Sequence, residues 1–193
     1  MLFKPKLARL TDEELMQKIG RGSEAALTEL YQRYSASLLR YFTRMLWSNR
    51  AMAEDFLHDL FLKIIHNPHQ FDTARKFSTW VYSVAHNMCK NEYRKNENRI
   101  LLAKDETPYH NYDLDREMDL TSANNRITLL LETLNEEDKT IFLLRYEDEL
   151  SIQEISQVVF MPEGTVKSRL FYLRKQLATE LNQYRIVLKE KSV

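Results

Sequence analysis

The 193-residue sequence contains only three glycines, four prolines and one cysteine. So little Gly and Pro argues against turn-rich β architectures and favours helices. The single cysteine, Cys89, excludes an intramolecular disulfide and a Cys-rich zinc site, and we expect it to be a small buried residue. This cysteine usage fits a reducing compartment.

Long apolar runs and a net charge are also missing. No stretch of about 18 apolar residues could span a bilayer, and the first residues lack the apolar core of a signal peptide. We therefore expect a cytoplasmic protein with no membrane contact of its own. Lys plus Arg and Asp plus Glu each number 28, so any affinity for a polyanion must come from local segregation of charge.

Apolar residues recur at helical spacing between residues 11 and 99. Thr11 with Glu14 predicts a capping box, and Ser23 predicts a second helix start. The segment 53–66 is expected to bury one face and expose the other. The predicted buried residues are Phe56, Leu57, Leu60, Phe61, Ile64 and Ile65, and the predicted exposed ones are Asp55, His58, Asp59 and Lys63.

A polar break at residues 67–76 precedes another helix, predicted from about Ser78. Residues 102–125 then hold six acidic and two basic residues without a sustained apolar repeat, which is typical of a linker. We predict an all-α chain of two small helical domains joined by a flexible linker, the C-terminal one containing a helix-turn-helix. The expected bounds are 1–100, 101–125 and 126–193.

The helix-turn-helix is predicted from residues 151–177. Ser151 with Glu154 forms a capping box for a short helix, Ile152 to Val159, and Pro162 suits the first turn of a long one. Apolar residues of the long helix form one stripe, namely Val166, Leu170, Leu173, Leu177 and Leu181. Its other faces carry cations, hydroxyls and aromatics that suit a DNA major groove, namely Thr165, Lys167, Ser168, Arg169, Phe171, Tyr172, Arg174 and Lys175. A solvated amphipathic surface is the alternative, which the two aromatics disfavour.

Three motifs, taken from the C-terminal one to the N-terminal one, resemble segments of sigma factors. The segment PEGTVKSRL resembles the start of the recognition helix in the C-terminal sigma domain, which binds the minus-thirty-five promoter element. KFSTWVYSVAHNMCKNEYRK, residues 76–95, is similar to the part of the N-terminal sigma domain that opens and reads the minus-ten element. AEDFLHDLFLKII resembles the helix that docks on the clamp helices of the largest polymerase subunit. The short chain is similar to the extracytoplasmic-function group.

This resemblance implies functional residues. The loop 67–76 would help to form a pocket for an extruded base, beside a basic, aromatic segment. The implied minus-ten contacts are Arg75, Lys76, Phe77, Trp80, Asn87, Asn91, Arg94 and Lys95. The aromatic residues of this segment, Phe77, Trp80 and Tyr82, could equally be core. The implied polymerase contacts are Asp55, His58, Asp59, Leu62 and Lys63.

In the C-terminal domain the resemblance places Lys167, Ser168 and Phe171 in the groove, and Arg169 and Arg174 on phosphates. The chain departs from the family pattern at three places: His58-Asp59 replaces Gln-Glu, Asn91 replaces an acid, and Tyr172 replaces a residue that is often basic. The implied partners are core RNA polymerase, promoter DNA and an anti-sigma factor. No cofactor and no catalysis are expected.

Two other classes of protein were weighed. A metal enzyme could use His66, His69, His86 and Cys89, but no pair of histidines four residues apart on one helix carries the usual zinc-hydrolase pattern. A stand-alone dimeric helix-turn-helix regulator is the second. It leaves the tryptophan segment and the acidic linker unexplained.

Overall fold

The computed structural model describes residues 7–102 and 131–190, apart from the side chains of 100–102 and 180–190. The chain divides into two compact units, Met1–Glu117 and Met118–Val193. Within the described residues all regular elements are helical, as predicted. None of the described helices is both long enough and apolar enough to cross a membrane.

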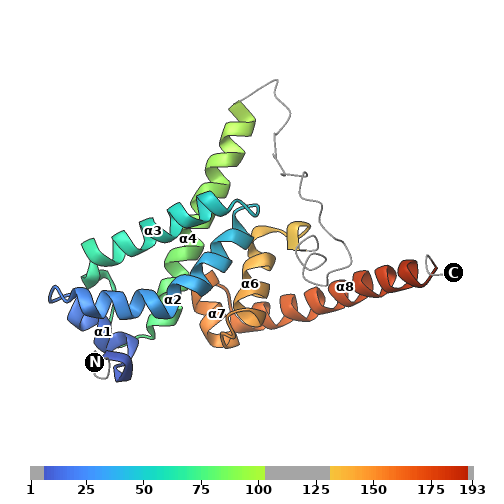
Figure 1. The fold of residues 1–193 in the computed structure, drawn as a ribbon. Helices are drawn as coiled ribbons and strands as arrows, with labels where there is room; N and C mark the ends of the chain where they lie inside the picture. Colours follow the sequence, from blue (N-terminus) through green and yellow to red (C-terminus); the bar gives the residue numbers. More distant parts are fainter. Residues whose placement is uncertain (1–6, 103–130, 191–193) are drawn as a thin grey trace. The chain divides into compact units, whose positions relative to one another are not determined.

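The N-terminal unit contains four α-helices: α1 (Asp12–Ile19), α2 (Glu24–Met45), α3 (Arg50–His66) and α4 (Phe77–Leu102). Two 3-10 turns, η1 (Leu7–Arg9) and η2 (Pro68–Gln70), flank α1 and α4 in the chain. In Figure 1, α2 and α3 lie side by side and α4 packs against both of them. Helix α1 packs against α2, α4 and η2.

Local capping signals place most of these helix starts. The capping box of Thr11 and Glu14 is present, and the Ser23 side chain accepts the N–H of Ala26, both as predicted. Asn49 accepts the N–H of Met52 and starts α3. Helix α4 begins one residue before the predicted start, and it continues to Leu102, two residues into the range expected to be linker. The rest of the expected linker lies outside the described residues.

The core of the N-terminal unit is rich in aromatic rings. Tyr41 and Phe42 of α2 are fully buried, and Tyr41 meets Tyr82 of α4 edge to face at 5.7 Å between ring centroids. Cys89 is buried here too, as expected. The prediction for Ile65 was wrong: its side chain is 44% exposed at the end of α3.

His86 of α4 is almost completely buried. Burial, with the charge of Lys90 added to it, lowers the pKa of His86 to about 4. The unfolded chain therefore takes up a proton near its ordinary pKa of about 6.5, whereas the folded protein does not. The free energy of unfolding should fall by up to about 3 kcal/mol as the pH drops from 6.5 towards 4.

Denaturant unfolding of the full chain at stepped pH values measures this loss. His86→Gln should show a shallower dependence over the same window, because glutamine does not titrate. An unchanged slope would mean that other groups cause the acid sensitivity.

The C-terminal unit contains α6 (Glu136–Tyr146), α7 (Ile152–Val159) and α8 (Glu163–Glu190), which pack on one another. Asn135 caps α6, and Ser151 with Glu154 forms the predicted capping box of α7. Helix α8 begins just after Pro162, whose carbonyl accepts the N–H groups of Thr165 and Val166, so this proline precedes the first turn instead of lying within it. The bounds of α7 are as predicted.

The predicted apolar stripe of α8 is confirmed as far as Leu173. Val166, Leu170 and Leu173 are buried, and Leu177 is half-buried. The side chain of Leu181 lies outside the described residues. The predicted opening helix of this unit also falls largely outside them, although Leu131 is buried.

Candidate functional site

The polar residues implied in minus-ten recognition share one face of α4. Asn87, Asn91 and Arg94 are exposed and follow one another at helical spacing, with Trp80 on the same stripe two turns earlier. Lys95 is exposed beside them. This stripe therefore combines amides, cations and one aromatic side chain along a single surface.

Trp80 lies at the first turns of α4 and is half-buried. Its ring centroid lies 5.3 Å from that of Phe71 and 5.7 Å from that of Phe77. These rings fix the indole on one side and leave part of it open to solvent. A rigid, partly open aromatic surface is what stacking on an unpaired base requires.

Phe77 does not belong to the exposed surface, so the structure gives no support to its predicted DNA contact. Its side chain is fully buried, because it packs against Tyr34 of α2 at 5.1 Å and Phe71 at 5.5 Å between ring centroids. Tyr82 is also buried. Of the three aromatics weighed for base contact, only Trp80 remains available.

The segment between α3 and α4 forms a compact turn. The Asp72 side chain accepts the N–H of Ala74 at 3.0 Å, and its carbonyl accepts the N–H of Arg75 at 2.9 Å. Arg75 and Lys76 are exposed at the end of this turn. The ion pair between Arg75 and Asp72 spans 3.6 Å with both side chains exposed, so it contributes little to stability.

The residues implied in polymerase binding lie along α3. Asp55, His58, Asp59 and Lys63 are exposed as predicted, and Leu62 is half-buried among them. The structure adds two apolar residues that sequence reasoning missed. Ile65 is exposed at the end of α3, and Tyr31 of α2 is exposed with its ring 4.7 Å from that of Phe61. Periodicity had assigned Ile65 to the core, so only the fold could reveal it.

The predicted groove-facing residues of α8 are exposed. Thr165, Lys167, Ser168 and Arg174 all reach solvent, and Phe171 and Tyr172 are 56% and 67% exposed. The two aromatic rings meet edge to face at 5.5 Å. Adjacent exposed aromatics are more informative than a single one, because contiguous apolar patches mark interaction sites.

Arg169 differs from its neighbours. Its guanidinium forms ion pairs with Glu137 and Asp138, each at 3.0 Å, in the first turn of α6. The side chain is about one-third exposed and is held against α6 instead of reaching outward. Arg169 therefore holds α8 against α6, and Arg174 is the exposed one of the two arginines predicted to contact phosphates.

The histidines and the cysteine that were considered as metal ligands differ in their exposure to solvent. His86 and Cys89 are buried on α4, whereas His66 and His69 are exposed. His66 contacts the carbonyl of Leu62 at 2.7 Å through Nδ1. Over residues 7–102 and 131–190, no three His, Cys, Asp or Glu side chains are grouped as a metal site requires.

Comparison with protein families matches both units. Residues 30–99 match Sigma-70 region 2, and residues 124–177 match Sigma-70 region 4. The first match contains α3 and most of α2 and α4, and the second contains α6, α7 and the first half of α8. The two candidate DNA surfaces thus lie in two separately matched regions, in the order that the motifs predict.

Individual relatives match over most of the chain. The ECF RNA polymerase sigma-E factor of Haemophilus influenzae is 30% identical over 90% of this chain and 96% of its own length. The ECF RNA polymerase sigma factor SigW of Bacillus subtilis is 28% identical over 86% and 94%.

Solved structures share the fold. CnrH in complex with the cytosolic domain of CnrY matches with a TM-score of 0.67 at 20% identity, over 89% of this chain and 97% of that one. The sigma factor RpoE in complex with the anti-sigma factor NepR, from Bartonella quintana, matches with a TM-score of 0.65 at 20% identity, over 80% and 97%. With both regions matched in order, this chain belongs to the extracytoplasmic-function group of sigma-70 RNA polymerase sigma factors, which bind core polymerase, direct it to promoters and initiate transcription.

Proposed function

We propose that the N-terminal unit captures unpaired minus-ten bases on α4 while α3 holds the polymerase clamp helices, and that α8 reads the minus-thirty-five duplex. The exposed stripe of α4 carries this proposal, because Trp80, Asn87, Asn91 and Arg94 combine on one face the stacking, hydrogen-bonding and charged groups that a single strand needs. A surface for duplex alone would not need a partly open indole.

Opening of DNA costs unstacking and unpairing, a few kcal/mol for each base that leaves the stack. Trp80 would recover part of that cost by stacking on an extruded base, and the turn 67–76 would form the wall beside it. Arg94 and Lys95 would hold the displaced strand through its phosphates, and the amides of Asn87 and Asn91 would read base edges. All of these side chains are exposed or half-buried on α4.

On α8, Lys167, Ser168 and Phe171 would enter the major groove near the start of the helix. Helices of this kind contact base edges with their N-terminal residues. Arg174, two turns further on, would contact the phosphate backbone. The ion pairs of Arg169 with α6 support a fixed orientation of α8 within the domain.

On α3, the acidic residues Asp55 and Asp59 would pair with cationic groups of the polymerase clamp helices. The apolar side chains of Leu62 and Ile65 would exclude water from the contact. His58 would contribute a hydrogen bond of different geometry from the family's usual glutamine.

We also expect an anti-sigma protein to bind this factor, since the structurally similar RpoE of Bartonella quintana was solved with an anti-sigma factor. Free protein should bind promoter duplex weakly, because its two domains bind DNA independently. Only polymerase would fix their spacing so that both domains bind the promoter at once and the overall affinity rises. The factor would act in the cytoplasm, beside the chromosome, and would perform no bond chemistry of its own.

Two variants test whether α3 binds polymerase and α8 recognises the minus-thirty-five element. A promoter is first selected from a randomised duplex library by wild-type protein with core polymerase from the source cell. Asp59→Ala should weaken core binding by about five- to tenfold, as expected for a charged contact at an interface, and keep the selected sequence preference. Lys167→Ala should keep core binding and lose about tenfold in preference at the minus-thirty-five element.

Each variant is the control of the other, because both remove one exposed charge. Core affinity is measured by fluorescence titration, and preference is measured by competition between the selected promoter and a minus-thirty-five mutant. The reverse pattern, with Lys167→Ala losing core affinity and Asp59→Ala losing preference, would overturn the assignment of the two surfaces.

A further inference from the structure

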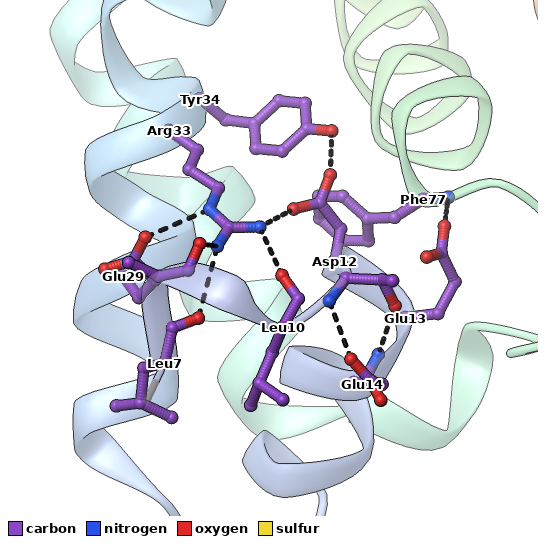
Figure 2. Close-up of polar contacts among 11 residues, drawn as sticks. Leu7, Leu10, Asp12, Glu13, Glu14, Glu29, Arg33, Tyr34 and Phe77 are labelled. Atoms are coloured by element: carbon purple, nitrogen blue, oxygen red, sulfur yellow. Dashed lines mark hydrogen bonds and ion pairs between the residues drawn. The ribbon is translucent and has the colours of Figure 1, made fainter. Parts of the chain in front are cut away.

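The start of α4 is held by a residue from another helix. Lys76 occupies the position just before this helix. Its side chain has no oxygen that could accept a backbone N–H, so it cannot cap the helix with a side-chain hydrogen bond. The N–H of Phe77 instead donates to Oε1 of Glu13 in α1, at 2.9 Å and across 64 positions of sequence. Figure 2 shows this contact.

Glu13 is well placed to act as such a cap because it is ionised and oriented. Partial burial raises the pKa of Glu13, but the N–H of Phe77, further backbone and side-chain hydrogen bonds and the charge of Lys76 lower it more, so the net pKa lies below its ordinary value. A carboxylate at a helix N-terminus also interacts favourably with the helix dipole.

The neighbouring residue, Asp12, ties the same turn of α1 to α2. Its carboxylate accepts from Arg33 at 2.7 Å and from the hydroxyl of Tyr34. Arg33 also pairs with Glu29 at 3.1 Å and donates to the carbonyl of Leu10 at 2.9 Å. The residues of this cluster converge from α1, α2 and the preceding turn (Figure 2), so Glu13 has little freedom to swing away from α4.

Helix α1 also supports the other side of the turn 67–76. It packs against η2, and a Cβ placed on Gly20, at the end of α1, would lie 3.9 Å from Cε1 of His69. The turn is thus supported by α1 near its beginning and held by Glu13 at its end. Trp80 rests on Phe71 and Phe77, so the position of the indole depends on both contacts.

We propose that Glu13 is a positioning residue for promoter opening: by capping α4 from α1, it fixes the turn 67–76 and Trp80 in the geometry that captures an unpaired base. The inference rests on the proposed role of α4 in minus-ten capture. It assigns to the N-terminal helix a part in DNA opening without any contact with DNA.

The test compares Glu13→Ala with Glu14→Ala in full-length protein with core polymerase on the selected promoter. Both changes remove one carboxylate from the first turn of α1, but among residues 7–102 the Glu14 carboxylate accepts only the N–H of Thr11, within its own capping box. Glu13→Ala should slow opening of duplex promoter by about tenfold, the value of a hydrogen bond to a charged group, and leave a promoter already unpaired at the minus-ten element within about twofold of wild type.

Glu14→Ala should stay within about twofold on both templates. Glu13→Gln keeps an acceptor oxygen but loses the charge, so its opening rate should lie between those of Glu13→Ala and wild type. Amide hydrogen exchange at Phe77 in the free protein should quicken by about tenfold in Glu13→Ala and remain near wild type in Glu14→Ala.

The inference would be overturned if Glu13→Ala opened duplex promoter at the wild-type rate. It would also be overturned if Glu13→Ala and Glu14→Ala lowered the opening rate equally. An equal loss on duplex and unpaired templates would overturn it as well, because the defect would then not lie in opening. A different result would show that the proposed function of α4 is wrong. Amide exchange at Phe77 would still be faster in Glu13→Ala, but variants of Trp80 and Arg94 would open duplex promoter at the wild-type rate.

Discussion

Replacing Trp80 and Arg94 together by alanine is expected to slow opening of a duplex promoter by about a hundredfold, with core binding nearly unchanged. Loss of one base–aromatic stack costs about 1–3 kcal/mol, and loss of a cation from the strand adds roughly 1 kcal/mol. Both side chains lie on the stripe of α4, whereas the proposed polymerase contacts lie on α3. Fluorescence of an adenine analogue placed in the minus-ten element follows opening directly.

Arg40→Ala is the matched control for charge. Arg40 is exposed on α2 and does not belong to the stripe of α4. Its loss should change opening by less than about twofold, since a solvated cation away from the strand contributes little. If the double variant lost polymerase affinity as strongly as opening, α4 would serve polymerase and not the single strand.

Phe77→Ala is expected to destabilise the N-terminal unit by about 3–5 kcal/mol, as is usual when a fully buried phenylalanine is truncated. The ring lies at the junction of three elements, touching Tyr34 of α2, Phe71 before α4 and Trp80 within it. Such a loss is a large fraction of a typical domain's stability. Denaturant unfolding followed by helical circular dichroism measures it.

Phe77→Leu and Trp80→Ala separate packing from recognition. Leucine should cost less than about 2 kcal/mol and preserve opening, because it still fills most of the site. Trp80→Ala should cost less stability than Phe77→Ala, because the indole is only half-buried, yet it should impair opening. If Phe77→Ala folded as stably as wild type but failed to open DNA, this result would favour a direct contact between Phe77 and DNA over a role in core packing.

Short-range signals explain why most of the fold was predictable. A capping box needs only two residues three positions apart, and the buried stripe of α8 needs only regular spacing, so Thr11, Ser151 and Val166 could be placed from the sequence. Which polar residues face solvent followed from the same periodicity.

Long-range contacts account for what the sequence did not reveal. Phe77 and Trp80 lie three positions apart in one motif, but only the packing of α2 and the preceding turn makes the first core and the second surface. The sequence predicts that Arg169 faces DNA, but in the fold its side chain forms ion pairs with Glu137 and Asp138 of α6. No local pattern marks a partner 31 or more residues away.

The cluster around Arg33 extends the folded unit beyond the residues that match the family model. The match to Sigma-70 region 2 begins at residue 30, after α1 has ended. Arg33 nevertheless donates to carbonyls of Leu7, Ala8 and Leu10, and α4 takes its cap from Glu13. A fragment cut at the limits of the matched region would leave this guanidinium without those acceptors, so we expect the N-terminal domain to fold fully only when it includes the residues from Leu7 onward, which precede the family match.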